Sequence, residues 1–220
     1  MREVTIPVLE PSPAQVRLME SAERLVALRG FDGASSRAIT QEAGHRNHSA
    51  IAYYFGNREG LIDSVYHWRS KPINVDRRAM VDDLVAHGRD TDPEALMRAF
   101  VEPYATALAA LRPSFWARYT VAALADRPLI FMGEVRRDLK RFSDIEVPLS
   151  VTLNLFDMMR AVACGGREPA AGLRVAVVIR SINATMAAWE ADVERKDLDT
   201  VPLAVLTEES VRLGAVTLTS

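Results

Sequence analysis

Apolar residues recur at helical spacing along almost the whole chain, and no other feature limits its fold as strongly. Leu18, Ala22 and Leu25 follow one another three or four positions apart, which places them on one face of a helix. Strand alternation, with an apolar residue at every second position, does not compete with this pattern. Val175 and Val177 could indicate a strand, but the alanines around them favour a long helix. The sequence therefore predicts an all-α protein.

Helix start and stop signals divide the first part of the chain into three compact helices and a connector. The first is expected from Pro13 to Gly30, because a Ser-Pro pair is typical of a helix start and glycine of a helix end. The second is expected from Ser35 to Ala43, before Gly44, and the third from about residue 48 to Phe55. A connector helix capped by Asn57 follows. Residues 12–68 are thus predicted to form an N-terminal three-helix domain.

Beyond residue 70 the helices become longer and are separated by proline and glycine. Because Pro72 lacks a backbone N–H and disfavours helical angles at Lys71, we expect the connector to be kinked or broken there and to act as a hinge. Residues 69–220 are predicted to form a larger helical bundle. The expected helices lie near residues 76–88, 93–111, 114–125, 128–142, 145–164, 168–195 and 202–218.

Composition and charge exclude several classes of protein. The formal net charge is -2, so the chain as a whole is not basic. An anionic partner would therefore have to bind to a locally basic region. The longest apolar runs are shorter than the roughly 18 residues that span a bilayer, and the first residues lack the apolar segment of a signal peptide. The single cysteine, Cys164, cannot form an internal disulfide. These features predict a cytoplasmic protein that does not enter a membrane.

Metal and catalytic sites receive little support from the sequence. His45 and His48 are three residues apart, but the cysteine is far away and no further ligands cluster near them. Nucleophile-elbow, metalloprotease and paired-carboxylate patterns are absent, and glycine after Cys164 has a plain helix-stopping role. We expect no metal, no cofactor and no enzymatic activity.

The stretch EAGHRNHSAIAYYFGNREGL, residues 42–61, concentrates polar and aromatic side chains between short apolar segments. Two short helices around a glycine-containing turn can place the second helix in the major groove of DNA. Residues 14–68 resemble the N-terminal domain of the TetR family of transcriptional regulators. The matching stretches are ALRGFDGASSRAIT, EAG, YYF and NREGL. The resemblance implies DNA binding as a dimer and an effector pocket in the second domain.

Three features of the sequence depart from the pattern of that family. The turn GHRNHS is one residue longer than the commonest pattern, and Ala52 stands where a tyrosine is usual. Tyr53 is the nearest substitute for the phosphate contact of that tyrosine. Arg58 replaces the usual lysine, and its two-pronged guanidinium can still bind phosphate.

Local charge and side-chain chemistry assign roles on DNA within residues 34–58. Three arginines oppose one glutamate there, so the segment carries +2 within an acidic chain. Asn47 and His48 are the strongest predictions for sequence reading, because helix-start side chains reach base edges and asparagine suits adenine. The expected base-reading residues are Arg37, Arg46, Asn47, His48 and Ser49. The expected phosphate-binding residues are Ser35, Tyr53, Tyr54 and Arg58.

Large, adaptable side chains are frequent in residues 93–164. This composition suits an apolar cavity between bundle helices, although it equally suits an ordinary core. The family resemblance favours a cavity that binds an effector. The expected lining residues are Phe100, Tyr104, Trp116, Tyr119 and Phe131, with Arg118, Asn154 and Asp157 as polar orienting groups.

An apolar stripe on the long helix 168–195 predicts the dimer interface. Together with helix 202–218, this helix could form a four-helix contact with a second copy, and burial within one chain is the alternative. The stripe consists of Val175, Val178, Ile182, Met186 and Trp189.

These features together predict a homodimeric, ligand-responsive transcriptional regulator, with repression as the favoured mode. It would bind a pseudo-palindromic operator in double-stranded DNA and be released by a small apolar or amphipathic effector. Two alternatives stay open: a helix-turn-helix DNA organiser without an effector, and an α-helical enzyme or small-molecule carrier.

Overall fold

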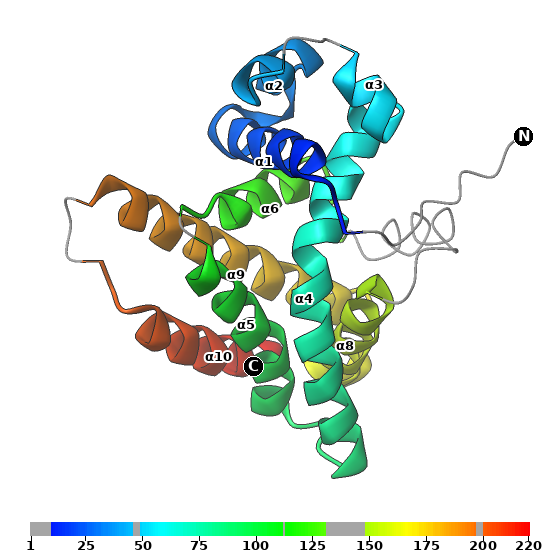
Figure 1. Ribbon diagram of the computed structural model, residues 1–220. Helices are drawn as coiled ribbons and strands as arrows, with labels where there is room; N and C mark the ends of the chain where they lie inside the picture. Colours follow the sequence, from blue (N-terminus) through cyan, green and yellow to red (C-terminus); the bar gives the residue numbers. More distant parts are fainter. Residues whose placement is uncertain (1–9, 46–48, 112, 131–147, 197–199) are drawn as a thin grey trace, which may run out of the picture.

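The computed structural model describes residues 10–45, 49–111, 113–130, 148–196 and 200–220. Within these residues every regular element is helical, which confirms the predicted all-α class (Figure 1). The helices are α1 (Pro13–Gly33), α2 (Ser36–Glu42), α3 (Ala50–Phe55), α4 (Arg58–Ala86), α5 (Pro93–Ala110), α6 (Trp116–Ala125), α8 (Pro148–Val162), the 3₁₀ turn η1 (Ala163–Gly166), α9 (Ala170–Arg195) and α10 (Leu203–Thr219).

Local sequence signals define the ends of the first helices. Ser12 caps α1 through a reciprocal pair of hydrogen bonds with Gln15, in which each side chain accepts from the other residue's backbone N–H. Gly30 has φ 69° and ψ 179°, a conformation that side chains disfavour, so the regular part of α1 ends there as predicted. Gly44 has φ 68° and turns the chain after α2. The sequence therefore specifies the turns around α2 locally.

Helix α4 runs without a break from Arg58 to Ala86 and contains Pro72. The break expected at Pro72 does not occur, and the helix expected at residues 76–88 is the second half of α4. The alternative of a kink at Pro72 stays a prediction. Pro72 removes one hydrogen bond of the helix, but Ile73, Asn74 and Arg77 beyond it are buried where α4 packs on α5 and α8. This packing holds the helical conformation across the proline.

The remaining helices form a bundle around α9 and α5. Helix α9 packs on α6, α8 and α10, while α5 packs on α4 and α10 (Figure 1). Within the described part of the chain, α9 alone is long and apolar enough to cross a bilayer, and half of its most apolar window is buried. That burial is typical of a core helix. The helix expected at residues 128–142 lies almost wholly outside the described residues.

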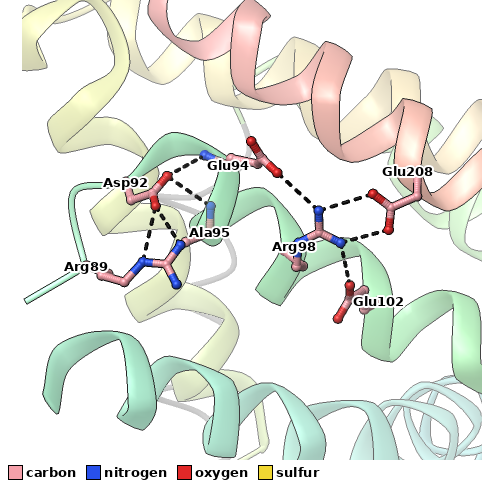
Figure 2. Close-up of polar contacts among 7 residues, drawn as sticks. All are labelled: Arg89, Asp92, Glu94, Ala95, Arg98, Glu102 and Glu208. Atoms are coloured by element: carbon pink, nitrogen blue, oxygen red, sulfur yellow. Dashed lines mark hydrogen bonds and ion pairs between the residues drawn. The ribbon is translucent and has the colours of Figure 1, made fainter. Parts of the chain in front are cut away.

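Polar groups fix the start of α5 and its contact with α10. Asp92 accepts hydrogen bonds from the backbone N–H groups of Glu94 and Ala95, and Arg89 pairs with the same carboxylate (Figure 2). Arg98 on α5 binds Glu208 on α10 with N–O distances of 2.8 and 3.1 Å, as well as two glutamates of its own helix. These groups are largely exposed, so they orient α10 more than they stabilise the fold.

Most of the apolar stripe of α9 is buried within a single chain. Val175, Val178, Ile182 and Met186 are all at most 5% exposed. Trp189 is partly buried, and its indole donates to the carbonyl of Val201 at 3.0 Å. The prediction of a dimer interface is therefore corrected for the first four residues, which belong to the core of one chain, as the alternative stated. Helical periodicity identifies an apolar face, but it does not say which neighbour covers that face.

Glu23 is a buried acid between α1 and α4. Its carboxylate binds Arg69 with N–O distances of 2.7 and 2.8 Å, but its Oε1 atom has no hydrogen-bond partner among the described residues. Burial disfavours the carboxylate and raises its pKa from 4.5 to about 7, although Arg69 acts in the opposite direction. The nearby acids Glu190 and Glu20 add to the increase.

We expect the free energy of unfolding to fall as pH rises from about 4.5 to about 7 because of Glu23. In this window the folded protein holds a proton that the unfolded chain has lost, so the stabilisation is complete below the window and absent above it. The pKa difference corresponds to roughly 3 kcal/mol. Denaturant unfolding at pH 5 and pH 8 should show a smaller decrease for Glu23→Gln than for the wild type. Asp32→Asn, at an exposed position of the same helix, should retain the wild-type decrease.

Candidate DNA-binding surface and ligand cavity

Helices α2 and α3 form the two arms of a helix-turn-helix motif. Ser35 caps α2 by accepting a hydrogen bond from Ala38 N at 3.2 Å. Thr40, a residue of α2, is fully buried. Ile39 and Ile51 are buried as well, so each short helix presents one face to the core and the other to solvent. This arrangement leaves one face of α3 free to meet a partner (Figure 1).

Several predicted DNA-binding residues lie on this exposed surface. Tyr53 is 81% exposed and packs edge-on against Tyr54, with ring centroids 4.8 Å apart. Arg37 and Ser35 are exposed on α2, and Ser49 precedes α3. Aromatic, hydroxyl and guanidinium groups are thus exposed on α2 and α3 or at the starts of these helices. The other predicted base-reading residues, Arg46, Asn47 and His48, lie outside the described residues.

Arg58 has a different role from the predicted phosphate contact. Its Nε donates to the carbonyl of Ala34 at 2.8 Å, and its NH2 donates to the carbonyl of Phe31. The guanidinium therefore ties the start of α4 to the end of α1. These hydrogen bonds give Arg58 an internal structural role, and its predicted contact with phosphate stays a prediction.

A cavity of about 630 Å³ lies between α4, α5, α6, α8 and α9. This volume is in the range of pockets that bind small molecules. One face of α4 lines it from Arg58 to Arg77, a distance of about 28 Å at 1.5 Å per residue. Four of the predicted lining residues are among its walls: Phe100, Tyr104, Trp116 and Tyr119.

The other predicted lining residues do not contribute to the cavity. Arg118 points into an ion-pair network with Glu190 and Glu194, at 3.0 and 2.6 Å. Asn154 is exposed, and Asp157 pairs with Arg160 at 3.4 Å. None of these three lines the cavity, so their prediction as orienting groups is wrong. Phe131 lies outside the described residues.

Three polar residues that line the cavity, Asn74, Arg77 and Thr152, were not predicted from the sequence. Arg77 is 5% exposed and lines the cavity together with Asn74 and Thr152. Ile73 and Val81 lie four positions before and after Arg77, so this arginine falls on an apolar helix face. That position was a usable signal, because an arginine on a buried stripe is uncommon.

Burial controls the protonation of the ionisable groups in the cavity. Desolvation raises the pKa values of Tyr66, Tyr104 and Tyr119 and lowers that of His67. The tyrosines therefore keep their protons at neutral pH and act as neutral polar groups. Burial lowers the pKa of Arg77 to about 10, so its guanidinium remains charged at neutral pH.

Helix α6 contacts both the helix-turn-helix domain and the cavity. It packs on α1 on one side and on α9 on the other (Figure 1). Its Trp116, Tyr119 and Thr120 line the cavity. The Tyr119 hydroxyl donates to the carbonyl of Ile62 in α4 at 2.9 Å, and its ring lies 6.1 Å from that of Phe31 in α1. A change in the cavity walls can therefore reach α1 through direct contacts.

The described residues contain no group of three or more His, Cys, Asp or Glu side chains that could hold a metal ion.

Comparisons with known proteins identify the N-terminal domain. The model of the bacterial regulatory proteins of the tetR family matches residues 18–65. No curated protein matches the sequence. A TetR-family regulator from Streptomyces coelicolor A3 is 14% identical, with a TM-score of 0.44, and 97% of this chain and 100% of that chain are covered. The multidrug binding protein EbrR complexed with imidazole is 16% identical, with a TM-score of 0.37 and coverage of 96% and 97%. The assignment therefore rests on residues 18–65.

Proposed function

The chain belongs to the tetR family of bacterial regulatory proteins through residues 18–65, and on this premise we propose that it is a ligand-responsive repressor of transcription. In this proposal a homodimer binds a pseudo-palindromic operator, and a small apolar or amphipathic effector releases it. The observation that carries the proposal is one helix, α6, that both lines a cavity of about 630 Å³ and packs against α1 of the DNA-binding domain. The protein would act in the cytoplasm, where bacterial DNA lies.

The proposed DNA interface consists of the exposed face of α3 and the start of α2. Tyr53 and Ser35 would bind phosphate oxygens, which position the protein without reading sequence. Asn47 and His48, assigned from their place in the sequence, would read base edges in the major groove. Arg37, Arg46, Ser49 and Tyr54 would complete the contacts.

The proposed release mechanism works through α4 and α6. An effector that enters the cavity contacts Tyr119, whose hydroxyl binds α4 and whose ring packs on Phe31 at the end of α1. Arg58 links that same end of α1 to the start of α4. Displacement of these groups would tilt α3 relative to the second copy, with a coupling of typically 1 to 3 kcal/mol.

The proposed dimer contact uses the outward faces of α9 and α10. Leu173 and Val177 are exposed on α9, and Val205, Leu213 and Val216 are exposed on α10. A groove of about 160 Å³ lies between the two helices, and Leu213 is one of its lining residues. Two such faces related by a two-fold axis can pack as a four-helix contact.

Two substitutions test the DNA interface on the duplex that the wild type selects from a random pool. Asn47→Ala should relax sequence preference, because it removes a base contact, whereas Tyr53→Phe should weaken binding to all duplexes by a similar factor of a few. Fluorescence anisotropy against the selected duplex and a shuffled duplex measures both effects. The assignment would be wrong if the two variants lost sequence preference to the same degree.

A further inference from the structure

The cavity contains a buried positive charge, and the described residues supply no buried counter-ion for it. Among the described lining residues, Arg77 is the only charged side chain that is fully buried, and none of its hydrogen bonds goes to a carboxylate. Desolvating a cation is expensive unless an opposite charge compensates it. Because Arg77 keeps its proton at neutral pH, the cavity holds a positive charge at that end.

Neutral acceptors hold the guanidinium in a fixed position. NH1 donates to Asn74 Oδ1 at 2.8 Å and to Thr152 Oγ1 at 2.7 Å, while Nε and NH2 donate to the carbonyls of Ala99 and Phe100. These four bonds use four of the five N–H groups of an arginine. One N–H group and the positive charge of Arg77 therefore remain available to a ligand. Because the guanidinium is already held in position, it can bind this ligand without changing its conformation.

Two buried polar atoms on residues that line the cavity have no hydrogen bond in good geometry within the described part of the chain. The Trp116 indole Nε1, which can only donate, has no hydrogen-bond partner among the described residues, and Trp116 is 3% exposed. The Tyr104 hydroxyl is likewise without a hydrogen bond in good geometry, although the Thr120 hydroxyl is a polar neighbour. Buried donors usually have acceptors.

The acidic lining residues of α4 are remote from this charge. Glu59 and Asp63 are exposed and lie 18 and 14 residues before Arg77 on α4, which corresponds to about 27 and 21 Å along the helix. Aromatic rings occupy the region beside Arg77: its guanidinium lies 5.3 Å from the Phe100 ring, which packs against Phe156 at 5.7 Å. One end of the cavity therefore combines a positive charge with apolar walls.

We propose that the ligand of this cavity is an amphipathic anion, with its anionic oxygens beside Arg77 and its aromatic or aliphatic body between Phe100, Phe156 and Trp116. The inference rests on the proposed role of the cavity as the effector site and specifies the chemical class of the effector. A neutral or cationic molecule of the same shape would leave the charge of Arg77 uncompensated.

Two fluorescent probes with the same ring skeleton test the inference on the full-length protein. Anilinonaphthalene sulfonate is an anion, and phenylnaphthylamine lacks its sulfonate. Because a hydrogen bond to a charged group is stronger than a neutral contact, the wild type should bind the anion about tenfold more tightly. Arg77→Met should remove this preference, and Arg77→Lys, which restores the charge, should recover most of it. Arg78→Met, an exposed neighbour on the same helix with the same change in charge, should retain it.

Each result of the probe experiment either supports or overturns the inference that the ligand is an anion. Equal affinities of the wild type for the two probes would overturn the inference, as would a preference that persists in Arg77→Met or the failure of both probes to bind. The comparison within the wild type needs no variant, so misfolding of Arg77→Met would not remove the test. If the anion binds preferentially but leaves the affinity for DNA unchanged, the ligand class of the cavity stands and the effector role in the proposed function fails.

Discussion

Glu190→Ala is expected to destabilise the protein by about 3 to 5 kcal/mol, the range for removing one partner from a buried ion pair. Glu190 is 2% exposed, and its carboxylate accepts hydrogen bonds from Ala117 N at 3.0 Å and from Arg118 N at 3.1 Å. These are backbone groups in the first turn of α6, which lacks a side-chain cap of its own. The same carboxylate accepts from the Ser114 hydroxyl and from Arg118 Nε. Alanine would leave all four donors without this acceptor.

Denaturant unfolding followed by circular dichroism measures this loss. Glu194→Ala is the matched control, because Glu194 pairs with the same Arg118 at 2.6 Å but is partly exposed. Its loss should cost less than about 1 kcal/mol. Similar effects of the two substitutions would show that Glu190 does not anchor α6. Since α6 lines the cavity and contacts α1, Glu190→Ala should also weaken the response to ligand in whatever protein remains folded.

Val177→Asp combined with Leu213→Asp is expected to produce monomers that have lost operator binding. Both side chains are exposed in a single chain, at 41% and 54%, so the charges should leave the fold intact. In a dimer they would be buried against the second copy, where unpaired carboxylates are unfavourable. A monomer engages one half-site, so its affinity for the operator should fall by about 10² to 10⁴.

Sedimentation and operator binding measure the two effects, and circular dichroism confirms that helical content is retained. Val75→Asp with Val85→Asp provides the control, because these exposed valines lie on α4, away from the proposed contact. The control should remain dimeric and bind operator normally. A dimeric Val177→Asp, Leu213→Asp double variant would place the interface elsewhere on the chain.

The parts of the fold that depend on local chemistry were predictable from the sequence. Gly30 and Gly44 adopt left-handed angles that side chains disfavour, so the ends of the first two helices follow from single residues. Ser12 and Asn57 cap helices as expected for the same reason. The family model at residues 18–65 confirms the resemblance seen in the short stretches of that segment.

The parts that depend on tertiary packing were not predictable in the same way. At Pro72 the local preference for a break is overcome by the burial of Ile73 and Arg77 against α5 and α8. Val178 and its stripe on α9 are covered by the same chain, and periodicity contains no information about which helix covers a face. Arg118 was assigned to a pocket, yet it binds Glu190, more than 70 residues away in sequence. Such pairings are set by the fold.

The most direct test of the central proposal is selection of bound duplexes from a random pool by the full-length protein. A dimeric regulator should enrich an inverted repeat whose two half-sites are centred roughly 34 to 36 Å, or a multiple of one helical turn, apart. Binding to that repeat should weaken with salt and exceed binding to a shuffled duplex by about a thousandfold or more. Enrichment of no sequence, or of a single half-site without symmetry, would contradict a dimeric operator-binding regulator.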